Sequence, residues 1–263
     1  MKQLSMVGTL CAAMAGLLSG GSAQATLVDR GGGMLYDTVL NVTWLQDANY
    51  AATSGYCNTA GNCGELLPFS TERLGRMNWT QANTWAHGLA HGGYNGWRLA
   101  RNTPVNGTQS GWNYTYSNNG STDLGYNITS PFSELSYMYY VNLGLKGFVN
   151  PDGSFRSDYG VFGNGTSGDG TAGGEGDVGL VKNLQSNIYW SGTAYEESYV
   201  GRAWVFINDF GIQFQYWQST HPGHFAWAVH DGDIAAVPVP GSVALLAGGL
   251  ALLGVVTRRR KPR

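Results

Sequence analysis

The chain has 263 residues and a formal net charge of −2. Its 40 glycines, 13% aromatic residues and only 12% charged residues disfavour helix bundles and coiled coils, because glycine and aromatic side chains suit loops and strands better. Nucleic-acid binding is also disfavoured, since there is no basic excess to neutralise phosphates. With 43% apolar residues, the chain is apolar enough to fold around a core.

Residues 1–25 have the three parts of a secretory signal peptide. Lys2 supplies a positive charge, Met6 to Leu18 is mostly apolar, and Ala23-Gln24-Ala25 carries the small residues of a cleavage site. We therefore expect export of the protein, with a mature chain that begins at Thr26.

Cleavage at this point removes one of the three cysteines, Cys11, and leaves Cys57 and Cys63. These two are six residues apart in a turn-rich stretch, and exported proteins meet an oxidising environment. The sequence therefore predicts a small structural disulfide between Cys57 and Cys63.

Residues 26–236 contain no linker that would split them and no internal repeat, so we expect one domain there. The predicted elements, in chain order, are a strand at 41–46, a helix at 78–89, a second helix at 131–142, and strands at 188–190, 203–208, 212–217 and 225–230. The first strand alternates in side-chain type, and the first helix has apolar residues at helical spacing. Helices that precede an antiparallel sheet indicate an α+β fold.

Local signals mark where these elements begin, end and turn. Asn78 and Gln81 resemble a capping box at the first helix, and Ser130 is expected to cap the second helix. Asp209-Phe210-Gly211 predicts a hairpin turn between two of the late strands. The stretch 163–179 holds eight glycines in 17 residues and is expected to be a surface loop.

The last 27 residues differ from the domain and fall into three parts. The parts are the stiff segment Val237 to Pro240, 16 uncharged residues from Gly241 to Val256, and a basic end with Arg258, Arg259 and Arg260. As a helix, 16 residues span about 24 Å, short of the roughly 30 Å hydrocarbon core of a bilayer. Such a marginal transmembrane segment suits a temporary anchor.

This order of Pro238 and Pro240, an apolar stretch and an arginine cluster resembles the PEP-CTERM sorting signal of Gram-negative bacteria. Val239 stands where the name-giving motif has glutamate. The resemblance implies recognition by exosortase, a membrane protease-transpeptidase, and export across the inner membrane to the cell surface, the outer membrane or the extracellular matrix. We expect the tail from Val237 to be removed after export.

The domain between the two termini is acidic. All 17 acidic residues lie between Asp29 and Asp233, with only nine basic residues among them, so this region carries a net charge of −8. Acidic polymers are therefore not expected as ligands unless a local arginine cluster or a bound cation offsets the repulsion between like charges.

Several segments of the domain follow the pattern of a known family. They are Val42-Thr43-Trp44, Trp79 to Ala82, Gly92 to Leu99 with its Gly-Trp-Arg-Leu ending, Ser133-Glu134-Leu135, Tyr189 to Thr193, and Ala203-Trp204-Val205. In this order they resemble the Lcl C-terminal domain family, also called domain of unknown function 1566. Two departures are Ala100, where proline is usual, and Gly192, where serine is usual.

This resemblance implies a C-type-lectin-like, formylglycine-generating-enzyme-like α+β architecture. For this chain we expect two helices, a C-terminal antiparallel sheet and long glycine-rich loops. Members of the family are mostly surface proteins thought to bind or adhere rather than to catalyse.

The sequence carries no phosphate loop, no dinucleotide-binding glycine pattern and no metalloprotease or hydrolase motif, so we predict no enzyme activity. Four pairs of side chains could do chemistry, but each has a plainer interpretation as a loop, a helix end or a solvated acidic turn. They are His87 with His91, His221 with His224, Glu196 with Glu197, and Asp231 with Asp233. Asp169, Glu175 and Asp177 could bind Ca²⁺ through oxygen, but their spacing matches no defensible calcium loop, so no metal or cofactor is predicted.

Aromatic side chains are the better binding candidates, because exposed aromatic rings stack on sugars or protein partners. Trp112, Tyr114 and Tyr116 lie in a stretch rich in asparagine, serine and glycine, which is not expected to bury all three. We expect them to bind ligand and to matter little for folding, and the alternative for any one of them is burial against the domain. Trp97 and Arg98, by contrast, are expected to be structural. On the late strands, alternation should bury half of the aromatic residues and leave the other half exposed or beneath a loop. Those residues are Trp204, Phe206, Tyr216, Trp217, Phe225 and Trp227.

Three functions remain open on the sequence alone. The first is a noncatalytic surface or matrix protein whose lectin-like domain binds a protein or a glycan such as exopolysaccharide. The second is an enzyme on the formylglycine-generating-enzyme-like scaffold, which would need Cys57 and Cys63 at a cleft near the C-terminal sheet. The third is a purely structural matrix component. We favour the first.

Overall fold

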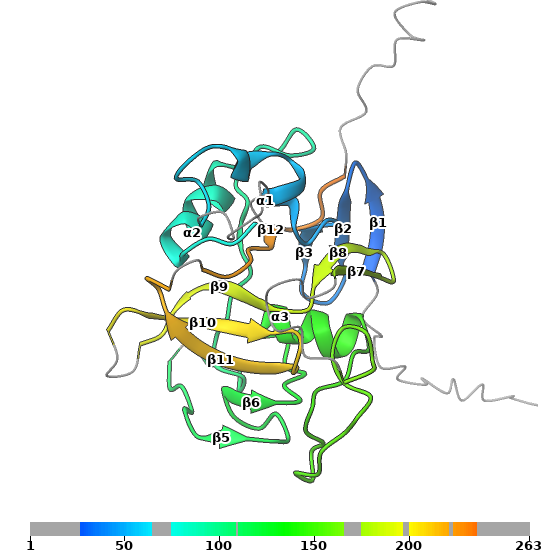
Figure 1. The fold of residues 1–263 in the computed structure, drawn as a ribbon. Coiled ribbons are helices and arrows are strands. Elements are labelled where there is room, and N and C mark those ends of the chain that lie inside the picture. Colours follow the sequence, from blue (N-terminus) through cyan, green and yellow to red (C-terminus); the bar gives the residue numbers. More distant parts are fainter. Residues whose placement is uncertain are drawn as a thin grey trace, which may run out of the picture.

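The computed structural model describes residues 27–64, 75–108, 110–165, 175–196, 200–220 and 223–235. Within these ranges the chain forms two five-stranded sheets, a two-stranded hairpin and short helices (Figure 1). This arrangement confirms the predicted α+β class. The signal peptide and the tail, with Pro238, Pro240 and Arg258 to Arg260, lie outside the described residues. Across the described ranges, no helix has the length and apolar character needed to span a bilayer.

The first sheet brings the two ends of the domain together. Its strands, in spatial order, are β1 (Leu27–Gly31), β2 (Met34–Asp37), β3 (Val42–Leu45), β12 (Ala228–Asp231) and β4 (Arg98–Leu99). Neighbouring strands are antiparallel, and Trp44 of β3 lies opposite Val229 of β12. All four residues of β3 are buried, as expected for a central strand that is covered on both faces.

The prediction of a strand at 225–230 is only partly correct. β12 begins only at Ala228, and it joins the first sheet rather than the hairpin of the late strands. Phe225 instead forms a bridge with Tyr189 of the second sheet, and its carbonyl accepts a hydrogen bond of 2.9 Å from the Trp190 amide. The chain crosses from one sheet to the other between Phe225 and Ala228, which ties the two sheets together.

The second sheet contains the predicted hairpin. Its strands, in spatial order, are β5 (Tyr116–Ser117), β6 (Leu124–Tyr126), β11 (Ile212–Trp217), β10 (Arg202–Ile207) and β9 (Ile188–Ala194). The β5–β6 pair is parallel and the other pairs are antiparallel. Gly211 in the hairpin turn has a φ of +72°, and a Cβ there would lie 2.7 Å from the Cα of Gly147, so this tight turn requires glycine.

The remaining elements are short. They are α1 (Tyr50–Thr53), the 3₁₀ turn η1 (Tyr56–Asn58), α2 (Trp79–Gly88), α3 (Glu134–Tyr137), the π-helical segment η2 (Met138–Asn142), and a hairpin of β7 (Glu175–Val178) and β8 (Val181–Gln185). α2 begins at the predicted capping box: Asn78 Oδ1 accepts from the Gln81 amide, and Gln81 Oε1 accepts from the Asn78 amide, each at 2.9 Å. β7 lies within the stretch 163–179 expected to be a loop, because it pairs with β8.

The second predicted helix begins later than expected. α3 starts at Glu134 rather than at 131, and it continues through η2 to Asn142, the predicted end. Ser130 does not cap this helix, because its hydroxyl donates to the Val105 carbonyl at 2.8 Å. The two helices expected from the sequence are therefore α2 and the α3–η2 segment, and α1 is an addition.

Tryptophan side chains fill the main core, which draws residues from both sheets. Trp44 and Trp227 pack with their ring centroids 4.7 Å apart, and the Trp227 indole donates to the Leu45 carbonyl at 2.7 Å. Trp97 and Trp190 are fully buried in the same core. This burial agrees with the structural role expected for Trp97.

Arg98 links the first sheet to α3. Its guanidinium donates two hydrogen bonds of 2.8 Å to the Glu134 carboxylate, and its Nε donates to Asp231 at 2.9 Å. Breaking such a buried ion pair by removing one partner costs about 3–5 kcal/mol, because the other charge is left uncompensated. Asp231 and Asp233 stay exposed on either side of Gly232, as expected for a solvated acidic turn, and each also forms an ion pair: Asp231 with Arg98 and Asp233 with Arg30 at 2.5 Å.

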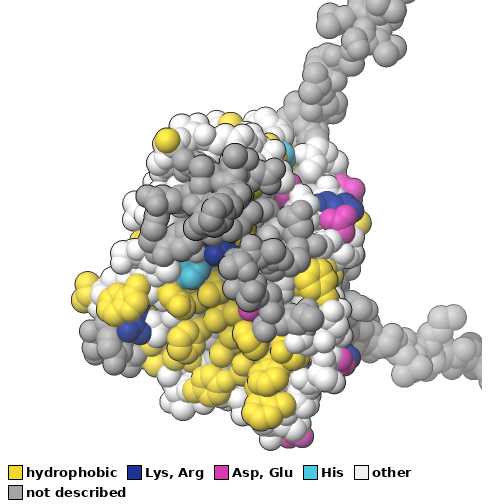
Figure 2. Space-filling view, viewed as in Figure 1, with side chains coloured by type: hydrophobic (Ala, Val, Ile, Leu, Met, Phe, Trp, Pro, Cys, Tyr) yellow, Lys and Arg dark blue, Asp and Glu magenta, His cyan; other side chains and the backbone are white. Residues whose placement is uncertain are grey.

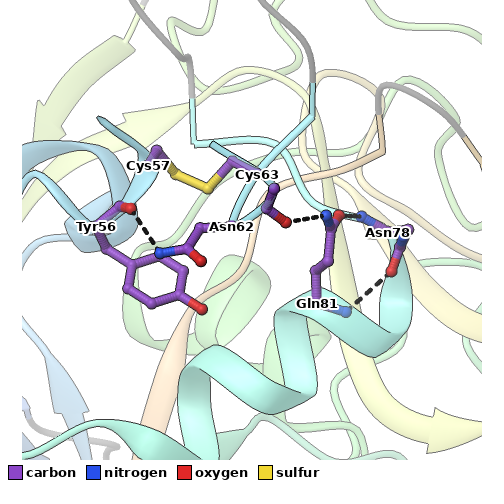
Figure 3. Close-up of a disulfide and its surroundings, with 7 residues drawn as sticks. Tyr56, Cys57, Asn62, Cys63, Asn78 and Gln81 are labelled. Carbon is purple, nitrogen blue, oxygen red and sulfur yellow. Dashed lines mark hydrogen bonds between the residues drawn. A yellow bond between two sulfur atoms is a disulfide. The ribbon is translucent and has the colours of Figure 1, made fainter. Parts of the chain in front are cut away.

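Cys57 and Cys63 are joined by a disulfide beside α2 (Figure 3). Both cysteines are buried, and Gln81 Nε2 of α2 donates to the Gly61 carbonyl between them at 2.7 Å. The bridge and this hydrogen bond fasten the short loop to the helix. A disulfide that closes so short a loop stabilises the fold by about 2 kcal/mol in the chain-entropy description.

Candidate binding site

Four aromatic side chains pack together at one end of the second sheet, and we call them the Trp204 stack (Trp112, Tyr114, Tyr195 and Trp204). Trp204 is fully buried at its centre. The Trp112 ring lies 4.9 Å from Trp204 at an interplanar angle of 27°, and the Tyr114 ring lies 6.2 Å from it at 13°. Tyr195 meets Trp204 edge-on at 4.9 Å. Trp112 and Tyr114 are half-buried, so part of each ring remains open to solvent.

A buried carboxylate holds the loop that carries Trp112. Asp123 Oδ1 accepts from the Val105 amide at 2.7 Å, and Oδ2 accepts from the Asn113 amide at 2.6 Å. The Asp123 carbonyl accepts from the side chain of Gln213 in β11 at 2.8 Å. Asp123 therefore fixes the loop against the second sheet and sets the position of Trp112.

The three loop aromatic residues expected to bind ligand do not lie together, because two of them pack on Trp204 and the third does not. The contacts of Asp123 draw Trp112 and Tyr114 onto Trp204, which brings these two rings together. Tyr116 lies elsewhere: it begins β5, is half exposed, and meets Tyr126 edge-on at 6.2 Å. Burial raises the pKa of the Tyr126 hydroxyl, and the contact with Tyr116 raises it further.

A small pocket lies at the end of β11, and we call it the Trp217 pocket. It has a volume of about 250 Å³ and is lined by Arg202, Phe214, Gln215, Tyr216 and Trp217. Trp217 is 49% exposed and Tyr216 is 38% exposed, so the pocket opens to solvent. Small-molecule pockets usually measure about 300–1,000 Å³, so this pocket has room for roughly one ring of a ligand.

The walls of the Trp217 pocket combine aromatic rings with planar polar groups. The Arg202 guanidinium lies over the Trp217 ring, 4.3 Å from its centroid, and its Nη1 donates to Gln215 Oε1 at 2.8 Å. Such a cation–π contact is worth about 0.5–1 kcal/mol at an exposed site, so Arg202 helps to hold the indole in place. The guanidinium and amide groups provide the hydrogen-bonding capacity that aromatic rings lack.

Three residues of the Trp217 pocket, namely Arg202, Gln215 and Trp217, lie on the same face of the second sheet as Trp204. In the register of β10 and β11, Arg202 lies opposite Trp217 and Trp204 lies opposite Gln215. Directly opposed residues point to the same face, as do residues two apart in one strand. Gln215 lines the pocket and also lies opposite Trp204, the residue on which Trp112 packs. Gln215 therefore lies between the pocket and the stack.

The other face of these strands is apolar. By strand alternation Ile212 and Phe214 lie on this face, and Phe214 also packs against the cluster that contains Trp204. Figure 2 shows hydrophobic side chains gathered over β10, β11 and β6. Phe214 also lines the Trp217 pocket, which therefore lies at the strand edge where both faces meet. β6 pairs with β11 only at Ile212 and Gln213, so within the described ranges the rest of β11 forms this edge.

The sequence interpretation did not single out Arg202 or Gln215, although it contained the signal that finds them. The predicted turn at 209–211 pairs Ile207 with Ile212, and counting back along both strands pairs Arg202 with Trp217. The observed register follows this count without irregularity. An arginine opposite an exposed tryptophan at a strand end could therefore have been predicted.

Of the three candidate calcium ligands, only Asp177 has a side chain in the described part of the chain. Asp177 accepts from Lys182 Nζ at 2.7 Å, and this hydrogen bond lowers the pKa of the Asp177 carboxyl. Asp169 and the side chain of Glu175 lie outside the described residues. Among the residues that are described, no group of three or more histidine, cysteine or acidic side chains is placed to hold a metal ion.

His87 and His91 are separated by the end of α2. His87 is exposed in the last turn of α2, whereas His91 lies past the end of the helix with its Nε2 2.8 Å from the Gly32 carbonyl. The two therefore do not share a helix face. His224 is buried, and His221 lies outside the described residues, as does Glu197 beside the exposed Glu196.

Comparison of the chain with protein-family models, with curated proteins and with solved structures finds no match. The candidate site therefore rests on its own geometry and chemistry.

Proposed function

We propose that the chain is an exported surface or matrix protein whose domain binds glycans without catalysing a reaction. The observation that carries this proposal is the Trp217 pocket, in which an exposed indole lies beside a guanidinium and an amide. Exposed aromatic rings stack on sugar rings, and well-placed polar groups fix the orientation of a ligand. The resemblance to the Lcl C-terminal domain family, with its lectin-like fold, supports the same function.

We expect Trp217→Ala to weaken glycan binding at least about tenfold, a loss of about 1.4 kcal/mol of binding energy. The indole is half exposed, so its removal should change the melting temperature little. The measurement is binding of the exported protein to a glycan array, with and without Ca²⁺, followed by titration of the strongest hit. Phe155→Ala is the matched control, because Phe155 is 74% exposed and stacks on Phe148 outside the pocket.

Equal binding by Trp217→Ala and the unchanged protein would place the site elsewhere. An array on which the unchanged protein binds nothing would refute the glycan-binding proposal and favour a protein ligand or a purely structural role.

We also propose that exosortase recognises the tail and that the tail is removed during sorting. Mass spectrometry of the surface-released protein from its host should find a first residue of Thr26 and no peptide beyond about Pro240. Replacing Arg258, Arg259 and Arg260 by alanine should leave the tail in place, since the basic cluster belongs to the proposed signal. Recovery of 257–263 on the mature surface form of the unchanged protein would rule out removal.

A further inference from the structure

We propose that the Trp217 pocket and the Trp204 stack form one extended site that binds an internal stretch of a neutral, linear polysaccharide. This inference rests on the proposed glycan-binding function and adds to it the class of ligand and a second contact surface. It concerns the face of β10 and β11 that carries Arg202, Trp204, Gln215 and Trp217.

The pocket and the stack lie close to each other on the sheet. Arg202 and Trp204 are two residues apart in β10, so their positions are separated by about 7 Å along the strand. Gln215 lines the pocket and lies opposite Trp204, so the pocket adjoins the stack at this pair. A ligand that places one ring on Trp217 and continues past Gln215 reaches the open parts of Trp112 and Tyr114.

The pocket alone is too small and too open to enclose a large ligand. The pocket measures about 250 Å³ and is open to solvent, so it encloses roughly one ring and leaves the rest of a larger ligand outside. Binding must also offset the lost freedom of the ligand, which a single weakly enclosed ring does poorly. Contacts with Trp112 and Tyr114 add the stacking area that the pocket lacks. The site therefore suits a chain better than a free monosaccharide.

The charge of the domain favours a neutral ligand. The region from Asp29 to Asp233 carries a net charge of −8, which repels polyanions. Arg202 is the one charged residue among the five that line the pocket, and its guanidinium already contacts Trp217 and Gln215. The surface between pocket and stack thus offers aromatic rings and an amide, which match a polymer of hydroxyl groups and uncharged rings.

Affinity electrophoresis of the exported protein tests this inference. The gels contain one of four neutral polymers (hydroxyethylcellulose, laminarin, amylose or galactomannan) or the polyanion alginate. We expect at least one neutral polymer to retard the protein and alginate not to retard it. Trp217→Ala and Trp112→Ala should each weaken the retardation at least tenfold, whereas Phe155→Ala should leave it unchanged.

A second measurement needs no variant, which matters because Trp112 also packs on Trp204. Oligosaccharides of two and six units, cut from the retarding polymer, compete for the unchanged protein. We expect the six-unit chain to compete at a concentration at least tenfold lower than the two-unit chain. Equal competition would reduce the site to the pocket and overturn the extended site.

The outcomes also separate this inference from the function on which it rests. Binding to the glycan array without retardation by any neutral polymer would overturn the ligand class and leave glycan binding intact. Retardation by alginate alone would do the same. Absence of binding in both experiments would overturn both proposals.

Discussion

Trp97→Ala is expected to lower the free energy of unfolding by about 3–5 kcal/mol, because it removes a large side chain from the closed core. Trp97 is 0% exposed, its ring lies between His91 at 5.8 Å and His230 at 5.7 Å, and its indole donates to the Tyr94 carbonyl at 3.2 Å. Domains of this kind have a total stability of about 5–15 kcal/mol, so the variant should melt far below the unchanged protein or fail to fold. Thermal and urea unfolding measure the loss.

Trp112→Ala is the matched comparison, since it removes the same side chain from a half-buried place. We expect it to lower the free energy of unfolding by about 1–2 kcal/mol. This loss is smaller than for a fully buried tryptophan, because solvent already reaches part of the Trp112 ring. Trp97→Phe, which keeps an aromatic ring, should lose less than Trp97→Ala. Equal losses for Trp97→Ala and Trp112→Ala would contradict the distinction between a core tryptophan and a binding-face tryptophan.

Local signals in the sequence were sufficient for the elements that are stabilised locally. The capping box of Asn78 and Gln81 marks the start of α2, and the Asp209-Phe210-Gly211 turn joins β10 to β11. Contacts between distant segments determine the parts of the fold that these local signals did not predict. Ser130 binds the Val105 carbonyl instead of capping a helix, and residues 228–231 pair with β3, nearly 190 positions earlier in the chain. Spacing within a short window cannot reveal such partners.

Local signals also predict one part of the binding face, the pocket, but not the other part, the stack. Alternation and the hairpin turn place Arg202 beside Trp217, so the pocket was within reach of sequence reasoning. The stack was not, because it depends on Asp123 accepting hydrogen bonds from Val105 and Asn113 across a loop without periodicity. Composition could not decide which of the loop aromatic residues are buried, and a single buried carboxylate places two of them on Trp204.

Two buried ionisable side chains have shifted pKa values with opposite effects on stability. Burial raises the pKa of Asp209 to about 6, so the folded state keeps this proton more tightly and gains stability as the pH falls from about 6 towards 4. Burial, helped by the charge of Arg76, lowers the pKa of His224 to about 3. The unfolded chain then takes up a proton below about pH 6.5 while the folded state does not, so stability falls between about pH 6.5 and 3.

His224→Phe is therefore expected to protect the protein against acid. The His224 ring lies between Trp190 at 4.6 Å and Tyr216 at 4.7 Å, and its Nε2 is buried without a hydrogen-bond partner in the described part of the chain, so phenylalanine replaces the ring without leaving a polar group unpaired. At pH 4.5 the unprotonated histidine costs the folded state about 3 kcal/mol, and at pH 7 it costs almost nothing. The stability of His224→Phe relative to the unchanged protein, from urea unfolding, should thus rise by about 3 kcal/mol between pH 7 and pH 4.5.

Asp209→Asn is the control of opposite sign: its relative stability should fall by about 2 kcal/mol over the same interval. A relative stability of His224→Phe that stays the same at both pH values would mean that the folded state accommodates the charged imidazole.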